Sequence, residues 1–140
     1  MIQKIKELVW FFPNTKVVSS QTLYHSIFAL ISLYEKTSEP YYLNEAKILA
    51  SNLTKLQNSD GGFNIGFNFL FGCGKLKPSN SSSTTPESLS IFAFYRLISS
   101  YKDEELKKNI KKCGDWIIQN SYGDKKKSIA YCPAYTKFNH

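Results

Sequence analysis

Three side chains are singled out by their positions as candidates for general acid or base chemistry. Asp60 precedes Gly61-Gly62 at the predicted end of a helix, and Glu87 lies in the first turn of another predicted helix. His25 lies one turn into a third. A carboxylate or an imidazole held within hydrogen-bond reach of a bound substrate can exchange a proton with it. Asp60, Glu87 and His25 are therefore the candidate catalytic residues.

Each of these candidates also has a structural alternative. The carboxylate of Asp60 can bond nearby backbone N–H groups and shape its turn, as aspartate commonly does. Glu87 can stabilise the positive end of its helix, and His25 can be a hydrogen-bonded packing residue. No acid–base pair can be assembled from these groups, because the matching helix start at residues 20–23 has no carboxylate.

Phenylalanines in a glycine-rich stretch are the candidate ligand-binding residues. Phe63 and Phe67 alternate with glycines at the start of a predicted loop over residues 59–85. A loop of this length without structure of its own is unusual in a compact domain and is often functional. Aromatic rings of such a loop can stack on sugar rings, or they can pack down as a lid on the helices.

The sequence predicts no cofactor and no metal site. The cysteines, Cys73, Cys113 and Cys132, match no zinc or redox spacing, and their odd number argues against a disulfide framework. We expect free, mostly buried thiols. The glycine-rich stretch lacks the lysine-serine ending of a phosphate-binding loop. No apolar run reaches the length of a membrane span or of a signal sequence, so we expect a soluble, cytoplasmic protein.

Composition and charge narrow the class of protein. The 140 residues suit a single domain over residues 1–140, and 42% apolar residues suit a globular chain. The net charge of +7 is concentrated in two lysine clusters, at 107–112 and 125–127. These lysines form either a solvated helix face or a surface that attracts an acidic polysaccharide or another anion. Nucleic acid is not expected as a partner, since no basic stripe is interleaved with aromatics.

Apolar periodicity predicts an all-α fold. Helices are expected over residues 2–12, 21–36, 41–57, 86–101 and from Asp103 to about Asn120, with a turn at residues 38–40. Asp103 is expected to cap the last of these helices. The helix over 86–101 is apolar almost all round, and the helix over 21–36 has one wide apolar face. Such apolar-rich helices are interpreted as inner helices. Those over 41–57 and 103–120 are apolar on one side and charged on the other, which is typical of outer helices.

The chain repeats itself. Leu56-Gln57-Asn58-Ser59-Asp60-Gly61-Gly62 is echoed 62 residues later by Ile118-Gln119-Asn120-Ser121-Tyr122-Gly123-Asp124. Ile27-Phe28-Ala29-Leu30 recurs 64 residues later as Ile91-Phe92-Ala93-Phe94. Repeat 1 spans about residues 20–62 and repeat 2 about residues 84–124. Hairpins of this kind bury their faces against neighbouring hairpins. Gln57 and Gln119 recur in both units, and we expect them to bond adjacent backbone rather than a substrate.

The repeat endings carry a family resemblance. The segment from Leu53 to Phe63 resembles the L-x-x-x-Q-x-x-D-G-x-(aromatic) ending of hairpins in α/α-toroid proteins, and Trp116 to Asp124 is a degraded second copy. Two groups share this ending: the six-hairpin carbohydrate-active proteins and the proteins similar to terpenoid cyclases and prenyltransferases. The resemblance implies antiparallel helical hairpins that form part of a ring around a central cavity.

The resemblance implies a function related to carbohydrates or polysaccharides, as a segment of a modifying or biosynthetic protein. A terpenoid-cyclase-like or prenyltransferase-like toroid is the alternative, although the sequence has no aspartate-rich motif. A non-catalytic interaction module is a third, and whether the chain is an enzyme stays open. Since a ring needs more hairpins than two, we expect the open faces to be covered by further C-terminal hairpins or by a second copy.

Overall fold

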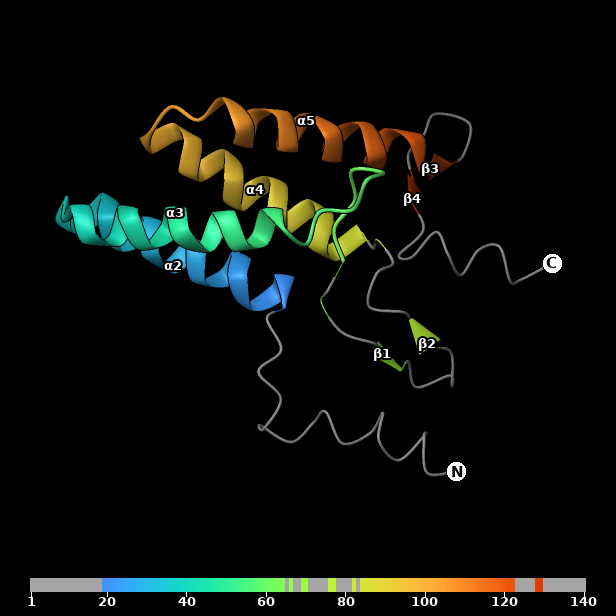
Figure 1. Cartoon of the computed structure of the whole chain (residues 1–140), viewed down its shortest axis with the longest axis horizontal. Coiled ribbons are helices and arrows are strands. Elements are labelled where there is room, and N and C mark those ends of the chain that lie inside the picture. Colours follow the sequence, from blue (N-terminus) through green and yellow to red (C-terminus); the bar gives the residue numbers. More distant parts are fainter. Residues whose placement is uncertain are drawn as a thin grey trace.

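Two helical hairpins make up the computed structural model, which describes residues 19–64, 66, 69–70, 76–77, 82, 84–122 and 128–129 (Figure 1). The four helices are α2 (Ser20–Thr37), α3 (Pro40–Thr54), α4 (Thr84–Ser100) and α5 (Glu104–Gln119). There are also two antiparallel pairs of two-residue strands among the described residues. β1 (Phe69–Leu70) pairs with β2 (Leu76–Lys77), and β3 (Ser121–Tyr122) pairs with β4 (Ser128–Ile129). The all-α prediction is confirmed for the described residues, while the helix expected over 2–12 lies outside them.

The first hairpin turns tightly between α2 and α3. Ser19 caps α2, its Oγ accepting from the backbone N–H of Thr22 at 3.1 Å. The helix ends at Thr37 and is followed by Ser38, whose φ of 58° is left-handed. Pro40 then begins α3, because proline suits the first helical position, where no N–H is needed. The turn expected at residues 38–40 is thus shorter than predicted.

α3 ends earlier than the expected Gln57. The backbone N–H groups of Leu56 and Gln57 donate to carbonyls three residues back, each at 3.0 Å, so the last turn tightens and the helix stops at Thr54. The chain then reverses: Gln57 pairs with Phe63 in an antiparallel bridge, and the Asn58 N–H donates to the Gly62 carbonyl at 2.7 Å. Residues 57–63 therefore form a tight turn, called here the Gln57–Phe63 turn.

The second hairpin keeps its predicted elements with small shifts. α4 begins at Thr84 rather than after Thr85, so both threonines lie within the helix. Asp103 caps α5 as predicted, and its Oδ1 accepts from the backbone N–H groups of Glu105 and Leu106 at 2.9 and 3.0 Å.

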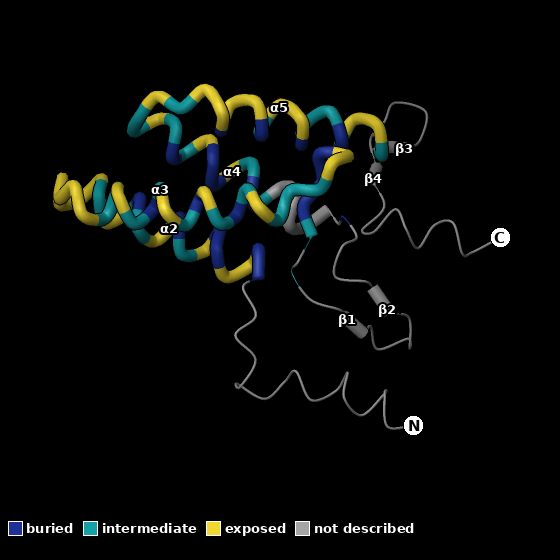
Figure 2. Tube along the Cα trace, in the orientation of Figure 1, coloured by how far each residue is buried: buried dark blue, intermediate teal, exposed yellow. Residues whose placement is uncertain are grey.

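The first helices of the two hairpins, α2 and α4, lie side by side and run in the same direction (Figure 1). α2 packs on α3 and α4, and α4 packs on α5 and also contacts α3. The core lies between them, where buried positions face inward (Figure 2). Its fully buried large side chains include Tyr24, Ile27, Ile31, Leu53, Phe63, Phe94 and Leu97. Cys113 is also buried, as predicted.

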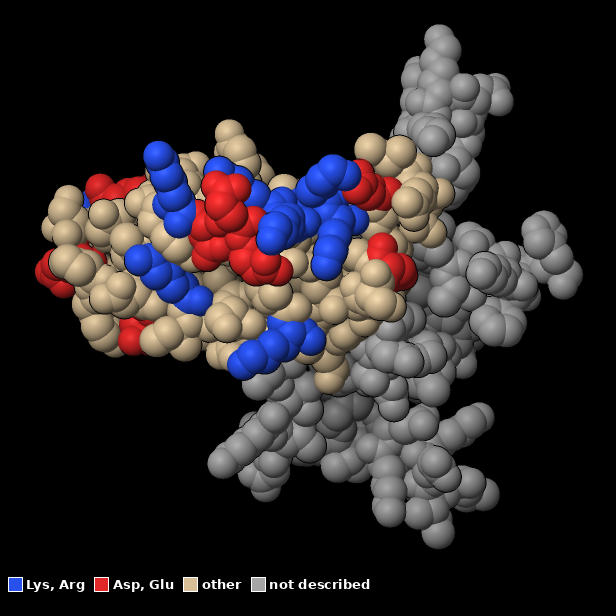
Figure 3. Space-filling view, turned by 45° about the horizontal axis from the view of Figure 1, so that its top comes forward, with Lys and Arg blue, Asp and Glu red and all other residues tan. Residues whose placement is uncertain are grey.

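The lysines of α5 lie on a solvent-exposed face. Lys107, Lys108 and Lys111 form ion pairs with Glu104, Glu105 and Asp115 on the same helix. Figure 3 shows basic and acidic side chains next to one another over this face. This cluster therefore fits the solvated-face alternative, while the lysines at 125–127 lie outside the described residues. No helix among the described residues combines the length and the apolar character that crossing a membrane requires.

Candidate functional site

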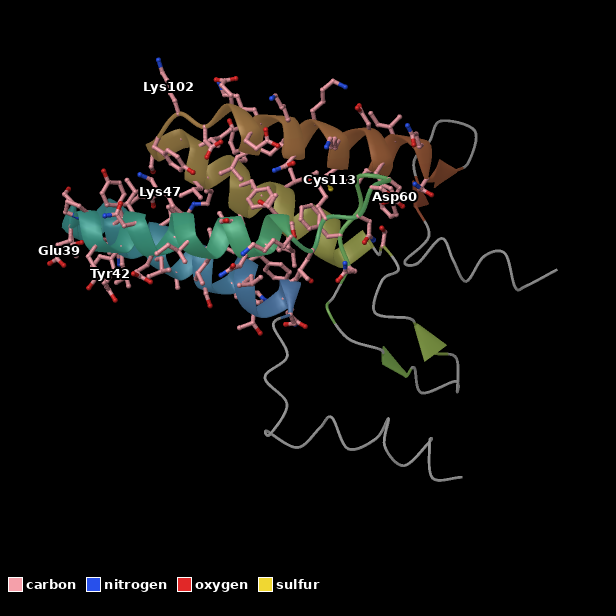
Figure 4. The ribbon with its side chains drawn as sticks, viewed as in Figure 1. Glu39, Tyr42, Lys47, Asp60, Lys102 and Cys113 are labelled. Carbon is pink, nitrogen blue, oxygen red and sulfur yellow. The ribbon has the colours of Figure 1, made fainter. Side chains whose placement is uncertain are left out.

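Asp60 is the centre of a hydrogen-bond network between the two hairpins. Its Oδ1 accepts from the Gly62 N–H at 2.9 Å, and its Oδ2 accepts from the indole N–H of Trp116 at 3.0 Å. The Ser82 hydroxyl donates to Oδ1 at 3.2 Å. Figure 4 shows Asp60 beside α5, the helix that carries Trp116. The carboxylate thus shapes its own turn and ties that turn to the second hairpin.

Gln57 and Gly61 make two further contacts at the same junction. Gln57 Nε2 donates to the carbonyls of Gly61 and of Asn109 in α5, each at 2.9 Å. Gly61 has a φ of +99°, and a Cβ placed there would lie 2.4 Å from the Lys112 carbonyl oxygen. Glycine is therefore required at this position by both conformation and space. The expectation that Gln57 bonds adjacent backbone is confirmed.

A mixed aromatic and charged surface lies along α2 and α4. The rings of Phe28 and Phe92 contact each other at 5.7 Å between centroids. One turn further along, Arg96 pairs with Glu35 at 2.6 Å and lies 3.3 Å from the Ser32 hydroxyl. We call the surface formed by these residues and the exposed His25 the α2–α4 surface.

His25 lies at the N-terminal part of this surface. Its side chain is exposed, and its ring contacts that of the buried Tyr24 at 4.6 Å. An exposed imidazole beside the Tyr24 ring can donate to, or accept from, a polar ligand. The position suits ligand contact better than core packing.

A cleft of about 320 Å³ lies between α3 and the corner that joins α4 to α5. Lys47 of α3 reaches across it to the ring of Tyr101, 4.3 Å from the centroid (Figure 4). The Tyr101 hydroxyl donates to Asp103 Oδ2 at 2.7 Å. Burial raises the pKa of Tyr101, and so does this bond to a carboxylate. The contact between Lys47 and Tyr101 joins α3 of the first hairpin to the α4–α5 corner of the second. The polar groups of Tyr101 and Asp103 are bonded to each other at this corner.

The remaining predicted site residues are placed as follows. Phe63 has no exposed surface, and its ring contacts Phe94 at 5.8 Å between centroids, which is the packing alternative for this ring. Glu87 lies in the first turn of α4, but its side chain is outside the described part, as is all of Phe67. Among the described side chains, Asp60 lies in the Gln57–Phe63 turn and His25 in α2, and the contacts described for each do not join them. Within the described residues, no group of three histidine, cysteine or acidic side chains could hold a metal.

The sequence does not predict two contacts of these networks, the Trp116–Asp60 hydrogen bond and the Arg96–Glu35 ion pair. Trp116 was not expected to bond Asp60, because the two lie far apart in the chain and neither carries a motif for the other. The Arg96–Glu35 pair was also missed. The repeat does carry a signal for it, since Arg96 occupies the position of Ser32 one repeat later and so lies on the matching edge of α4.

Comparison with known proteins adds no further assignment: no family model, curated protein or solved structure matches the chain.

Proposed function

We propose that this chain is a segment of an α/α-toroid protein of carbohydrate or polysaccharide metabolism, and that it binds saccharide on the α2–α4 surface. The observation that carries the proposal is the Phe28–Phe92 ring pair beside the Arg96–Glu35 ion pair. In a toroid, the first helices of the hairpins face the central cavity. This surface would then line it.

The chemistry of the surface suits a sugar ring. A pyranose has an apolar face of C–H groups, which packs on aromatic rings, and a rim of hydroxyls. Hydroxyls form strong hydrogen bonds with charged partners such as guanidinium and carboxylate groups. Phe92 is 57% exposed, so its ring is available to a ligand. Aromatic walls with a few fixed polar groups are typical of small-molecule sites.

The proposal is tested by glycan-array binding of the 140-residue chain, followed by calorimetry with the oligosaccharides that bind. Phe92→Ala is expected to weaken binding about tenfold or more, which corresponds to about 1.4 kcal/mol. Tyr41→Ala is the matched control, because Tyr41 is an equally exposed aromatic at the start of α3. This control is expected to bind as the wild type does.

Two results would count against the proposal. One is a folded chain that binds no glycan on the array. The other is equal binding by the Phe92 and Tyr41 variants. Phe63→Ala is not an informative test of binding, because it removes a fully buried ring and would unfold the turn. The terpenoid-cyclase-like reading stays the alternative, and it requires an aspartate-rich motif that this sequence does not contain.

A further inference from the structure

Large apolar side chains are exposed on opposite sides of the two-hairpin stack. Leu33 of α2 is 41% exposed, and Tyr95 of α4 is 60% exposed. In a helical repeat, each hairpin buries the sides of its helices against the neighbouring hairpins, so apolar side chains left exposed at such sides are candidates for a further stacking contact. The repeat itself identifies what each side is shaped to receive.

The helices of the two hairpins begin at matching positions. Ser20 and Thr84 begin α2 and α4, and Pro40 and Glu104 begin α3 and α5, with a separation of 64 residues in both cases. Each residue of the first hairpin therefore has an equivalent 64 positions later. Burial can then be compared position by position.

One side of α2 is exposed where the equivalent side of α4 is buried. Ala93 and Leu97 of α4 are fully buried, whereas their equivalents in α2, Ala29 and Leu33, are exposed. Leu30 is half-buried, while its equivalent Phe94 has no exposed surface. The reason is that α4 has a preceding hairpin beside it, and α2 has none among the described residues. We call Ala29, Leu30 and Leu33 the α2 face.

The opposite side of α4 shows the reverse pattern. Ile27 and Ile31 of α2 are fully buried, whereas their equivalents in α4, Ile91 and Tyr95, are half-buried and exposed. Phe92, beside them, is also exposed. We call Ile91, Phe92 and Tyr95 the α4 face. Its residues are the equivalents of Ile27, Phe28 and Ile31, which lie on the side of α2 that packs against the second hairpin.

The second helices repeat the asymmetry. Ala46 and Ala50 of α3 are buried, while their equivalents in α5, Ile110 and Gly114, are half-buried. A Cβ placed on Gly114 would meet nothing within 4 Å. The open side of α5 therefore continues the open side of α4.

We propose that a second copy of this chain stacks head to tail on the first, with its α2 face against the α4 face of the preceding copy. The packing of α2 on α4 within one chain is the template, since the new contact would place the same repeat positions together again. The Phe28–Phe92 contact already joins equivalent positions, and a second copy would bring its own Phe28 beside the exposed Phe92. Both faces consist of uncharged residues, so no charge opposes the contact.

Such a contact is heterologous, because the two faces differ. It leaves an α2 face open at one end and an α4 face open at the other, so copies add until the arrangement closes into a ring, or continue to add as an open filament if the rotation between copies does not close. The α4 face shares Phe92 with the α2–α4 surface, so a second copy would cover this ring. The inference is tested separately from saccharide binding, because association is measured by mass in the absence of glycan.

The test is sedimentation equilibrium of the 140-residue chain from about 1 to 100 μM, with circular dichroism to verify folding. The wild type is expected to associate with rising concentration. Tyr95→Glu disables only the α4 face, and Leu33→Glu disables only the α2 face, so each variant alone should be monomeric. An equimolar mixture should form a dimer and nothing larger, because the two intact faces are complementary. Lys108→Glu, on the exposed side of α5, is the charge-change control and should associate as the wild type does.

Three outcomes would overturn the inference. They are a folded wild type that stays monomeric at 100 μM, a single-face variant that still self-associates, and a mixture of the two variants that does not dimerise. If the wild type associates but the mixture of the two variants does not dimerise, the association uses a contact other than the α2 face against the α4 face. A variant that fails to fold is replaced by Tyr95→Ser or Leu33→Ser, with the same expected results.

Discussion

Trp116 and Asp60 join the two hairpins through one hydrogen bond of 3.0 Å, from the indole N–H to the carboxylate Oδ2. Trp116 is 3% exposed, so its N–H has little access to water. The bond thus satisfies a buried donor of α5 with an acceptor from the end of the first hairpin. It explains why an aspartate at the end of repeat 1 serves the architecture of the stack.

Removing the Asp60 carboxylate should destabilise the fold. Asp60→Ala deletes the acceptor of Trp116, Gly62 and Ser82, and it should lower the free energy of unfolding by about 1–3 kcal/mol, as for buried donors left unsatisfied. Urea denaturation measures the change. Asp115→Ala is the control, since Asp115 forms only an exposed ion pair with Lys111 and should cost less than about 0.5 kcal/mol.

The origin of that loss can be isolated with a double-mutant cycle. In a Trp116→Phe background, Asp60→Ala should cost measurably less than in the wild type, because the shared bond is already absent. An identical cost in both backgrounds would show that the Trp116 bond is not what stabilises the junction.

Substitution by alanine should have opposite effects on stability at Gly61 and at Gly114. Gly61→Ala combines a positive φ with a Cβ 2.4 Å from the Lys112 carbonyl oxygen, and it should cost more than about 1 kcal/mol. Gly114→Ala places a methyl group in open space inside α5 and should stabilise the chain by about 0.5–1 kcal/mol. Thermal unfolding of both variants measures the pair. A neutral Gly61→Ala would mean that the turn does not approach α5 as closely as described.

Charge at Gln57 should be far more costly than charge at its counterpart in the second repeat. Gln57→Glu replaces a donor that bonds two carbonyls with an acceptor that repels them, and it should cost about 1–3 kcal/mol at pH 7. The loss should shrink at low pH, where the new carboxyl group is protonated and can donate again. Gln119→Glu, at an exposed position, should be nearly neutral. Equal losses for the two variants would contradict the bridging role of Gln57.

Asp103 should make stability depend on pH in the acid range. Its pKa lies below the usual value for aspartate, first because its carboxylate accepts from the Leu106 N–H and then because of the Tyr101 hydroxyl. A lowered folded-state pKa gives stability that is present above the unfolded pKa, about 3.9, and is lost as pH falls toward the folded value. Asp103→Asn retains a capping amide but removes the charge, so it should cost about 0.5–1 kcal/mol at pH 7.

The difference between Asp103→Asn and the wild type should begin to narrow below about pH 4, where the unfolded chain takes up the proton, and should keep narrowing as the pH falls toward the lowered pKa of the folded carboxylate. Chemical denaturation at pH 7, 5 and 3 gives the comparison. A difference that stays constant over this range would mean that the charge of Asp103 does not contribute.

Local features of the fold were predictable because they depend on neighbouring residues. Asp103 was recognised as a cap, since an aspartate before a charged, apolar-striped segment satisfies the first N–H groups of a helix. The apolar pattern predicts an end of α3 that is too late, because Leu56 continues the apolar stripe. The backbone N–H of Leu56 already bonds a carbonyl three residues back, so the α-helix has ended there. Periodicity reports which residues are apolar and does not report hydrogen-bond spacing.

Long-range features were not predictable in the same way. Ile31 and Tyr95 occupy equivalent repeat positions, yet one is buried and the other exposed. The segments around these two residues are similar in sequence. Their difference in burial arises because another hairpin lies beside Ile31 and none of the described residues covers Tyr95 in the same way. For the same reason, the sequence alone allows both a catalytic and a structural role for Asp60. The hydrogen bond from Trp116 to Asp60 depends on the packing of α5 beside the Gln57–Phe63 turn, which the sequence does not predict.

The Gln57–Phe63 turn has a consequence for how the chain is made. Gln57, Asp60 and Gly61 all complete their contacts on α5, at Asn109, Trp116 and Lys112. As the chain leaves the ribosome, α2 and α3 can pair early, but the end of their hairpin stays unfinished until α5 has been synthesised. The two hairpins should therefore mature together rather than one after the other. A nascent chain of which only the residues up to 64 have emerged from the ribosome would expose Phe63, which is the kind of apolar surface that chaperones bind.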